Sequence, residues 1–360
     1  MTRQFREWSF SLTTVREQYE QFLEGWLVPA AARSQCACRA RDEARSPVRT
    51  DYQRDRDRIV HSQAFRRLKS KTQVFLPPSG DHVRTRLTHT LEVTQIARTI
   101  SRALHLNEDL TEAIGLGHDL GHTPFGHAGE SALAGVFPGF RHNEQSLRVV
   151  DRLEKDGQGL NLTEDTRDGI LRHSKPESHI SGEMTGRPAT AEGQVVKISD
   201  GISYISHDLD DARSADLLND RPLPPEVESV LGTRHSQRID TLVRSVIDHS
   251  RPLMQQPVAG RQVIVMGSDE LRAADALRRF LFEEVYEPIN RLPSTQYARE
   301  IVVRLFEYHV QHSELTTSRC ADNAGQETAE RRAADFVSGM TDDFARRRYN
   351  ELFVPRFEEI

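Results

Sequence analysis

Apolar residues recur at helical spacing in one segment of this chain after another. Between residues 88 and 104, for example, Val93, Ile96 and Ile100 follow one another three or four positions apart. This spacing places them on one face of an α-helix. The alternation of apolar and polar residues that marks a half-buried strand is scarce along the 360 residues. The sequence therefore predicts an all-α protein.

Turn-forming residues set the limits of the expected helices. Asn107 precedes an apolar-periodic run and is a candidate N-cap for a helix that ends near Gly121. Pro and Gly predict loops over residues 70–85 and 174–193. From about residue 226 the chain again reads as helical, with breaks near 251–270 and 318–327. The other expected helices cover 12–27, 55–69, 88–104, 143–153, 164–173 and 194–212.

Three regions follow from this organisation. Residues 1–45 form an N-terminal extension, 46–215 a helical core, and 216–360 a C-terminal helical region that packs on the core. Proline residues at 222, 224 and 225 mark the second boundary.

Composition excludes several classes of protein. No run approaches the roughly 18 apolar residues that a membrane span needs, and the charged N-terminus lacks the apolar core of a signal peptide. The three cysteines, Cys36, Cys38 and Cys320, are too few and odd in number for a disulfide framework. A Cys-x-Cys pair without further ligands makes a poor metal site. We expect a cytoplasmic protein.

Charge is distributed unevenly. The net charge is −6, yet residues 33–71 hold twelve Lys or Arg against five Asp or Glu. A basic stretch in an acidic protein indicates either a site for an anionic ligand such as phosphate, or a solvated surface that meets an acidic partner.

Histidine and aspartate residues fall where they could bind a metal ion. His118 and Asp119 are adjacent at the end of an otherwise apolar helix, where burial of a carboxylate is costly unless it is paired or metal-bound. His89 opens the preceding helix, and Asp200 lies within a later one. Two imidazoles and two carboxylates suit Mn²⁺, Fe²⁺, Mg²⁺ or Zn²⁺. Each residue alone has an ordinary structural explanation, so the hypothesis depends on their order along the helices.

The chain resembles the HD superfamily, and within it the deoxyguanosinetriphosphate triphosphohydrolase-like proteins. The match covers most of 46–215 in order, together with a segment near the end of the chain. The residues that carry it are RDRDRIVHSQAFRRLKSKTQVF (54–75), RTRLTHTLEVTQIARTI (84–100), NEDLTEAIGLGHDLGHTPFGHAGE (107–130), FRHNEQSLRVVDRLE (140–154), LNLTEDTRDGILRH (160–173), KISDGISYISHDLDD (197–211) and RRAADFVSGMTDDFARRRYNELF (331–353).

The resemblance implies an HD-domain helical bundle over 46–215 with N- and C-terminal helical extensions. It also implies a metal shell and a catalytic group beside it. His127 and Glu130 match a proton-handling pair, and their spacing places them on one face of a starting helix. A carboxylate that orients an imidazole holds a general acid or base in one tautomer. The metal ligands implied are His89, His118, Asp119 and Asp200, and the catalytic residues His127, Glu130 and His142.

Further residues match the family's substrate contacts. His122, His142 and Arg86 match residues that meet the phosphates, and a planar guanidinium suits phosphate oxygens. Tyr204 and Asp208 follow Asp200 at helical spacing and so lie near one face of that helix. The resemblance assigns these two, with Gln73, to the sugar 3′-OH, and a tyrosine against the sugar would crowd out a 2′-OH.

The activity implied is hydrolysis of a deoxynucleoside triphosphate to deoxynucleoside and inorganic triphosphate, with Mn²⁺ or Mg²⁺ as first candidates for the metal and Fe²⁺ as another. The resemblance also implies a homo-oligomer and a nucleotide activator at a second site. Two alternatives stay open. One is an HD phosphohydrolase of another nucleotide, such as a monophosphate, a cyclic nucleotide or a guanosine polyphosphate. The other is a nucleotide-sensing or nucleic-acid-binding module, and the basic stretch 33–71 supports this alternative.

Overall fold

The computed structural model of the chain describes residues 13–73, 84–174, 186–218, 221–316 and 327–354. Within these ranges the regular secondary structure is helical, apart from two isolated bridges, Arg39 to Thr163 and Thr72 to Thr85. The prediction of an all-α protein is confirmed. Among the helices described, none combines the length and apolar character that crossing a membrane would require.

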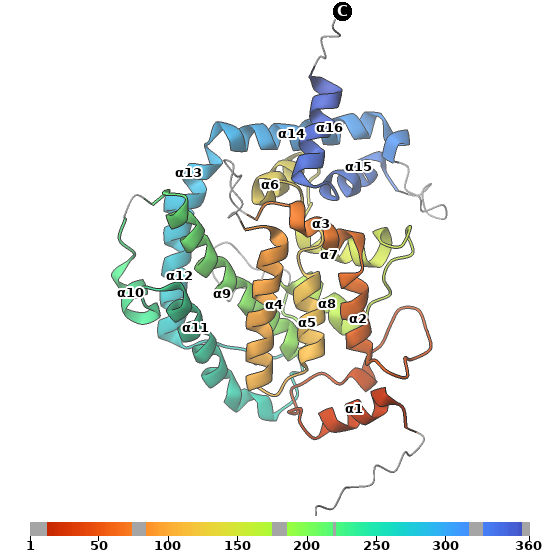
Figure 1. Cartoon of the computed structure of the whole chain (residues 1–360), viewed down its shortest axis with the longest axis vertical. Coiled ribbons are helices and arrows are strands. Elements are labelled where there is room, and N and C mark those ends of the chain that lie inside the picture. The colour runs from red at the N-terminus through yellow and green to blue at the C-terminus, as the bar shows by residue number, and fades with distance from the viewer. Residues whose placement is uncertain (1–12, 74–83, 175–185, 219–220, 317–326, 355–360) are drawn as a thin grey trace, which may run out of the picture.

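Three helices form the centre of the molecule and carry the four predicted metal ligands. Helix α5 (Glu108–Gly117) packs against α4 (Arg86–Ala103), and both pack against α9 (Ala191–Ser214) (Figure 1). Their apolar stripes are buried in one shared cluster. The other helices of the core and the N-terminal helix are α1 (Val15–Glu24), α2 (Asp51–Val60), α3 (Gln63–Arg67), α6 (Gly126–Val136), α7 (His142–Arg148) and α8 (Glu164–Arg172).

Polar caps fix where the central helices begin. The Asn107 side chain accepts hydrogen bonds from the backbone N–H groups of Asp109 and Leu110, so its prediction as the N-cap of α5 is confirmed. Helix α4 begins at Arg86, two residues earlier than expected, because Thr85 and Thr88 form a capping box. The earlier start places Arg86 in the first turn, beside His89.

Two predicted helices differ from the structure. The single helix expected over 55–69 is wrong, because α2 ends at Val60 and the Ser62 hydroxyl caps α3 as a separate helix. The helix expected over 143–153 is α-helical only to Arg148 and continues as a π turn. Much of the loops expected over 70–85 and 174–193, and of the break near 318–327, lies outside the described residues.

The C-terminal region covers the core on two sides. Helices α11 and α12 pack against α9, and α14 packs against α6, α15 and α16 (Figure 1). A second apolar cluster joins Leu133 of α6 to Ile301 and Leu305 of α14. The bounds are α10 (Pro225–Leu231), α11 (His235–Ser250), α12 (Ser268–Leu281), α13 (Glu287–Asn290), α14 (Pro293–Gln311), α15 (Ala329–Ser338) and α16 (Asp342–Phe353). Short 3₁₀ turns cover Ser34–Cys36, Leu68–Ser70, Arg251–Gln255 and Ser313–Thr316, and π turns cover Val149–Leu153 and Phe282–Tyr286.

Candidate active site

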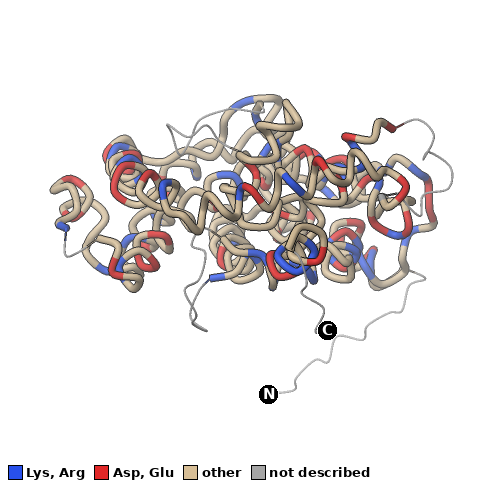
Figure 2. Tube along the Cα trace, turned by 90° about the horizontal axis from the view of Figure 1, so that it is seen from above, with Lys and Arg blue, Asp and Glu red and all other residues tan. Residues whose placement is uncertain are grey.

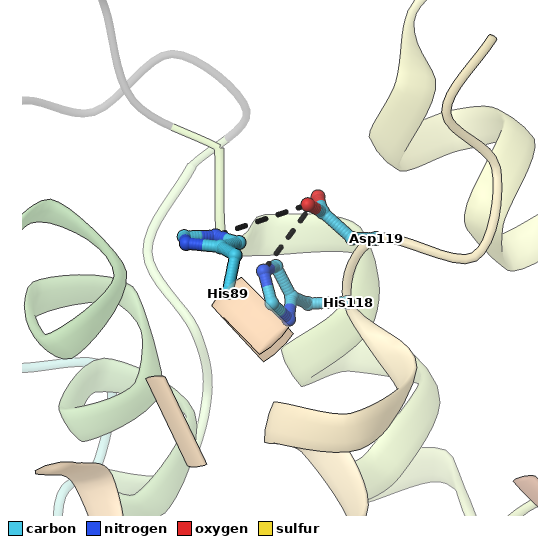
Figure 3. A group of neighbouring side chains, drawn as sticks. All are labelled: His89, His118 and Asp119. Carbon is cyan, nitrogen blue, oxygen red and sulfur yellow. Dashed lines mark ion pairs between the residues drawn. The ribbon is translucent and has the colours of Figure 1, made fainter. Parts of the chain in front are cut away.

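The four predicted metal ligands lie together although they come from three parts of the chain. His89 Nε2 is 3.2 Å from Asp200 Oδ1 and 3.9 Å from Asp119 Oδ2. His118 Nε2 is 3.6 Å from Asp119 Oδ1 and 4.0 Å from Asp200 Oδ1. Figure 3 shows three of these side chains, His89, His118 and Asp119, turned toward one another. The first turn of α4, the end of α5 and the middle of α9 thus supply one cluster of donor atoms.

The environment of His118 fits a bound cation. Its Nδ1 lies 2.7 Å from the carbonyl oxygen of Gly115, which can only accept, so the ring proton is on Nδ1. The lone pair of Nε2 then faces the carboxylates, and this buried atom has no hydrogen-bond partner among the described residues. Buried polar atoms without a partner are rare in proteins. Two imidazoles with two carboxylates suit a divalent ion such as Mn²⁺, Mg²⁺, Fe²⁺ or Zn²⁺.

The protonation states also suit metal binding. Burial lowers the pKa of His89, which favours the neutral imidazole. Burial alone would raise the pKa of Asp119, but the neighbouring His118 and the Arg86 guanidinium outweigh it and hold that pKa below its ordinary value. Neutral imidazole and ionised carboxylate are the forms that bind a metal ion.

Arg86 joins the metal cluster to the neighbouring loop. Its guanidinium donates to Asp119 Oδ2 at 2.7 Å and to the Gln73 carbonyl oxygen at 3.3 Å, and only 1% of the residue is exposed. The Gln73 carbonyl also passes close to Gly126, where a Cβ atom would lie only 2.5 Å from it at a φ of +58°. Glycine is therefore required at this position, where α6 starts beside the cavity.

Glu130 lies near His127, the histidine predicted to pair with it, but is closer to His142. Its Oε1 lies 2.8 Å from the backbone nitrogen and 2.8 Å from Nδ1 of His142, whereas its Oε2 is 3.7 Å from His127 Nδ1. Burial lowers the pKa of His142, but the Glu130 carboxylate outweighs it and raises that pKa overall. His142 is thus favoured as an imidazolium, while the His127 side chain is 52% exposed at the cavity.

His122 and His142 stack face to face, with ring centroids 4.0 Å apart and planes 15° apart. Burial, followed by the charge of Arg86, lowers the pKa of His122 well below its ordinary value. The pair therefore combines a neutral and a charged imidazole beside Asp119.

His173 is a site residue that the sequence predictions omitted. It follows α8, with Nδ1 2.7 Å from the Ile170 carbonyl oxygen and Nε2 3.1 Å from His142 Nε2 and 3.9 Å from Asp119 Oδ1. Burial lowers the pKa of His173 to about 3, so this ring is neutral and its Nε2 can accept a hydrogen bond from His142 Nε2. The available signal was its place at the end of LNLTEDTRDGILRH, one of the segments that carries the family resemblance.

A cavity of about 560 Å³ opens beside the metal cluster. The predicted residue Gln73 lines it, as do Arg86, His122 and Tyr204. Its volume lies in the range of small-ligand sites. The C-terminal region also supplies part of the wall, which the sequence predictions did not anticipate: Arg278, Phe282, Tyr286, Asn290 and Arg299.

Asp208 lies behind this wall. It is fully buried and is not among the side chains that line the cavity. Its Oδ2 accepts a hydrogen bond from the Tyr286 hydroxyl, and the Tyr286 ring lies 5.7 Å from that of Tyr204. The predicted row along α9 therefore reaches the cavity at Asp200 and Tyr204, and Asp208 supports it from behind.

The C-terminal region also holds the loop that carries His122. The buried Lys71 ammonium donates to the carbonyl oxygens of His122 and, at 2.8 Å, Ser338. The Asp342 carboxylate accepts from the backbone N–H groups of Thr72 at 3.0 Å and Phe125 at 2.9 Å. Through Ser338 and Asp342, α15 and α16 are thus bonded to Lys71, Thr72 and Phe125, and Lys71 in turn bonds the His122 loop.

Seven of the twelve Lys and Arg residues in the stretch 33–71 form ion pairs with acids among the described residues. Arg39 pairs with Asp51 and Asp55, and Arg58 pairs with Glu43. Figure 2 shows the described acidic and basic residues mixed along the chain, with neither sign confined to one face. The further pairs of this stretch with acids are Arg33 with Glu24, Arg39 with Glu43, Arg45 with Asp51, Arg49 with Asp57, Arg54 with Glu43 and Asp51, and Arg56 with Asp57 and Glu112.

Comparison with known proteins gives matches along nearly the whole chain. Residues 86–205 match the HD domain and residues 264–351 the phosphohydrolase-associated domain. A deoxyguanosinetriphosphate triphosphohydrolase-like protein of Caldanaerobacter subterraneus subsp. tengcongensis is 50% identical over 95% of this chain and 96% of its own length. Relatives of the same name from Desulfatibacillum aliphaticivorans and Clostridium tetani are 46% and 40% identical over 95% and 97% of this chain, and over 99% of their own lengths. The chain thus belongs to the deoxyguanosinetriphosphate triphosphohydrolase-like family of HD-domain phosphohydrolases.

Proposed function

We propose that the protein hydrolyses deoxynucleoside triphosphates to deoxynucleosides and inorganic triphosphate. The observation that carries this proposal is the cavity beside the His89–His118–Asp119–Asp200 cluster, which has imidazoles and a guanidinium near the cluster and tyrosines in its wall. The imidazoles and the guanidinium suit the negative charge of a polyphosphate, and the tyrosines suit a sugar. The names of the relatives support the same substrate class.

The metal ion, with Mn²⁺ or Mg²⁺ as first candidates and Fe²⁺ as another, would be held by His89, His118, Asp119 and Asp200. When bound, it supplies Lewis-acid polarisation of a phosphoryl oxygen and a lower pKa for water.

The chain's own residues supply charge and proton transfer. Water attacks the α-phosphorus, the bond to the 5′-oxygen breaks, and the leaving oxygen takes up a proton. His142, charged through Glu130, can donate that proton, and His127 stands at the exposed side of the same carboxylate as the second candidate. Arg86 and His122 offset the charge that gathers on the phosphate oxygens.

Tyr204 and Tyr286 form the proposed sugar end of the site. Their rings and the buried Asp208 carboxylate behind them restrict the room beside the sugar. We propose that Gln73 recognises the 3′-OH, with Tyr204 against the position of a 2′-OH. The direct contact to the 3′-OH that the resemblance gave to Asp208 is not retained, because that carboxylate lies outside the cavity lining and accepts from Tyr286. The amide oxygen of Gln73 supports this role, since it is buried and has no hydrogen-bond partner in the described part of the chain.

We further propose a cytoplasmic homo-oligomer with a nucleotide activator at a second site, as the family resemblance implies. The nucleic-acid-binding alternative loses part of its support, because seven of the twelve basic residues in 33–71 form ion pairs with acids. An HD phosphohydrolase that acts on another nucleotide remains the competing hypothesis, and product analysis separates the two.

The proposal is tested by incubating the purified protein with each of the four deoxynucleoside triphosphates, singly and mixed, with Mn²⁺ or Mg²⁺. Deoxynucleoside release is followed by chromatography, with Asp119→Asn as the inactive control. We expect metal-dependent release that chelation abolishes, and release only from mixtures would indicate the activator. Hydrolysis of a monophosphate, cyclic nucleotide or guanosine polyphosphate without hydrolysis of any deoxynucleoside triphosphate would refute the proposal.

A further inference from the structure

His207 is a buried histidine that the proposed reaction does not use. It lies on α9 with none of its surface exposed, one helical turn beyond the cavity residue Tyr204. Its Nε2 is 2.9 Å from Nδ1 of His89, and the two rings meet edge to face with centroids 5.1 Å apart. Its Nδ1 is 2.8 Å from Oδ1 of Asp208. The ring thus stands between a metal ligand and a buried carboxylate.

The proton positions along this row follow from which atoms can only accept. The Asp208 carboxylate is acceptor-only, and its Oδ2 already accepts from Tyr286. The proton of a neutral His207 is therefore on Nδ1, facing Oδ1. His207 Nε2 then has a free lone pair, which accepts the proton on His89 Nδ1. With that proton on Nδ1, the Nε2 atom of His89 presents its lone pair to Asp119 and Asp200.

We infer that His207 is a positioning residue for the metal site, which fixes the tautomer and ring orientation of His89, and that Asp208 in turn fixes His207. Ligand histidines commonly donate their second ring N–H to such a partner, and loss of the partner typically weakens metal binding. The opposite tautomers would place a hydrogen on His89 Nε2, where the metal ion should bind.

The contact between His207 and Asp208 is close but not aligned as a hydrogen bond. Neither His207 Nδ1 nor Asp208 Oδ1 has a hydrogen-bond partner elsewhere in the described chain. A buried polar atom without a partner is costly, so a small rotation of the imidazole that aligns this pair is favourable. Each atom is the natural partner of the other.

A histidine that merely fills space in this protein looks different. His309 on α14 is also buried, but both of its ring nitrogens lack hydrogen-bond partners among the described residues. Its ring packs edge-on against Phe336 at 4.6 Å. His207 instead forms a hydrogen bond to a metal ligand through Nε2, and its Nδ1 lies 2.8 Å from a carboxylate oxygen. His309 is therefore a matched control for the loss of a buried imidazole.

This inference rests on the metal site of the proposed function and not on the identity of the substrate. It also connects the two ends of the cavity, because the carboxylate that accepts from Tyr286 is the one that anchors His207. A change at the sugar end of the site is thus expected to alter metal affinity.

Mn²⁺ affinity, measured by electron paramagnetic resonance without nucleotide, tests the inference. In His207→Gln the amide oxygen stands as many bonds from Cβ as Nε2 does, so it can still accept from His89. In His207→Asn the shorter side chain reaches only the position of Nδ1. We expect Mn²⁺ affinity within about threefold of wild type for His207→Gln and for the control His309→Gln, and roughly 10- to 100-fold weaker for His207→Asn.

Equal wild-type affinity in His207→Gln and His207→Asn would overturn the positioning role alone, whereas a wild-type protein that binds no Mn²⁺ would overturn the metal site and the proposed function with it. Circular dichroism identifies a variant that fails to fold. Nitrogen-15 NMR of the Mg²⁺-loaded wild type gives a second test that needs no substitution. We expect the imidazole protons of His89 and His207 on Nδ1, and a proton on Nε2 of either ring would contradict the inference.

Discussion

Glu130 Oε1 lies 2.8 Å from Nδ1 of His142 and 2.8 Å from the backbone nitrogen of the same residue. One carboxylate oxygen thus fixes both the position of α7 at its first residue and the orientation of the imidazole. The other oxygen is 3.7 Å from His127 Nδ1. The family resemblance suggested His127 as the histidine that Glu130 orients, but the closer contact makes His142 the histidine whose charge depends most on Glu130.

Substitution of Glu130 by Gln should therefore reduce activity and change its pH dependence. Because the carboxylate raises the pKa of His142, its loss lowers that pKa, and His142 loses its proton at a lower pH. We expect kcat to fall about 100-fold or more, with the basic limb of the pH–rate profile moved to lower pH. The control is Glu144→Gln, at an exposed carboxylate on α7, the helix that begins at His142. An unchanged basic limb in Glu130→Gln would show that His142 is not the proton donor.

Tyr204 should govern the choice between deoxyribose and ribose. Its ring lines the cavity and packs beside the Tyr286 ring, and the Tyr286 hydroxyl donates to the buried Asp208 carboxylate behind the wall. Tyr204→Ala would open room for a 2′-OH, and we expect the ratio of kcat/KM for a ribonucleoside triphosphate to that for the deoxy form to rise about tenfold. Tyr297→Ala, at an exposed tyrosine of α14 outside the cavity lining, should leave the ratio unchanged. The prediction fails if both variants keep the wild-type ratio.

Lys71 should make stability depend on pH in the metal-free protein. Burial, followed by the charges of Arg86 and Arg67, lowers the pKa of Lys71 to about 7 from an ordinary value of 10.5. Between these values the unfolded chain binds more protons than the native one, so native stability rises with pH. Relative to Lys71→Met, the wild-type free energy of unfolding should rise by roughly 1 kcal/mol per pH unit over this window.

Denaturant unfolding with a chelator at several pH values measures this difference. The exposed Lys69→Met, two residues away, should stay parallel to wild type throughout. A wild-type curve parallel to that of Lys71→Met between about pH 7.5 and 9.5 would mean that Lys71 titrates at its ordinary pKa.

Asp342 should stabilise the loop that carries His122. Asp342→Ala would leave the buried N–H groups of Thr72 and Phe125 without their acceptor. Each such loss costs about 1–3 kcal/mol, so we expect thermal or denaturant unfolding to show a loss of roughly 2–6 kcal/mol. Activity should fall as well. Asp343→Ala, at the neighbouring exposed residue, should change stability and activity by little. An equally small effect of Asp342→Ala would show that Asp342 does not stabilise the His122 loop.

Much of the fold could be predicted because its signals are local. Helix α5 has its N-cap at Asn107, and the stripes of α4 and α9 are buried as their spacing predicts. The break at His61–Ser62 was missed because Ser62 acts as a cap inside a segment whose apolar spacing continues across it. The π turn after Arg148 has no local signature in the sequence.

The residues of the candidate site could be predicted where they lie within sequence motifs. Contacts between segments far apart in the sequence could not. The four metal ligands lie in motifs in chain order, and the structure brings them together. The partnership of Asp208 with His207 and Tyr286 joins α9 to a segment about 80 residues away, and no pattern within either segment specifies it. The same holds for the bonds from Lys71 and Asp342, which depend on how α15 and α16 pack.

The most direct test of the proposed reaction is phosphorus-31 NMR of the products formed from a deoxynucleoside triphosphate in ¹⁸O-labelled water with Mn²⁺ or Mg²⁺, the metal being removed before acquisition. Attack on the α-phosphorus predicts inorganic triphosphate that carries the label on a terminal phosphorus, together with unlabelled deoxynucleoside. Orthophosphate or pyrophosphate as the primary product would contradict the account.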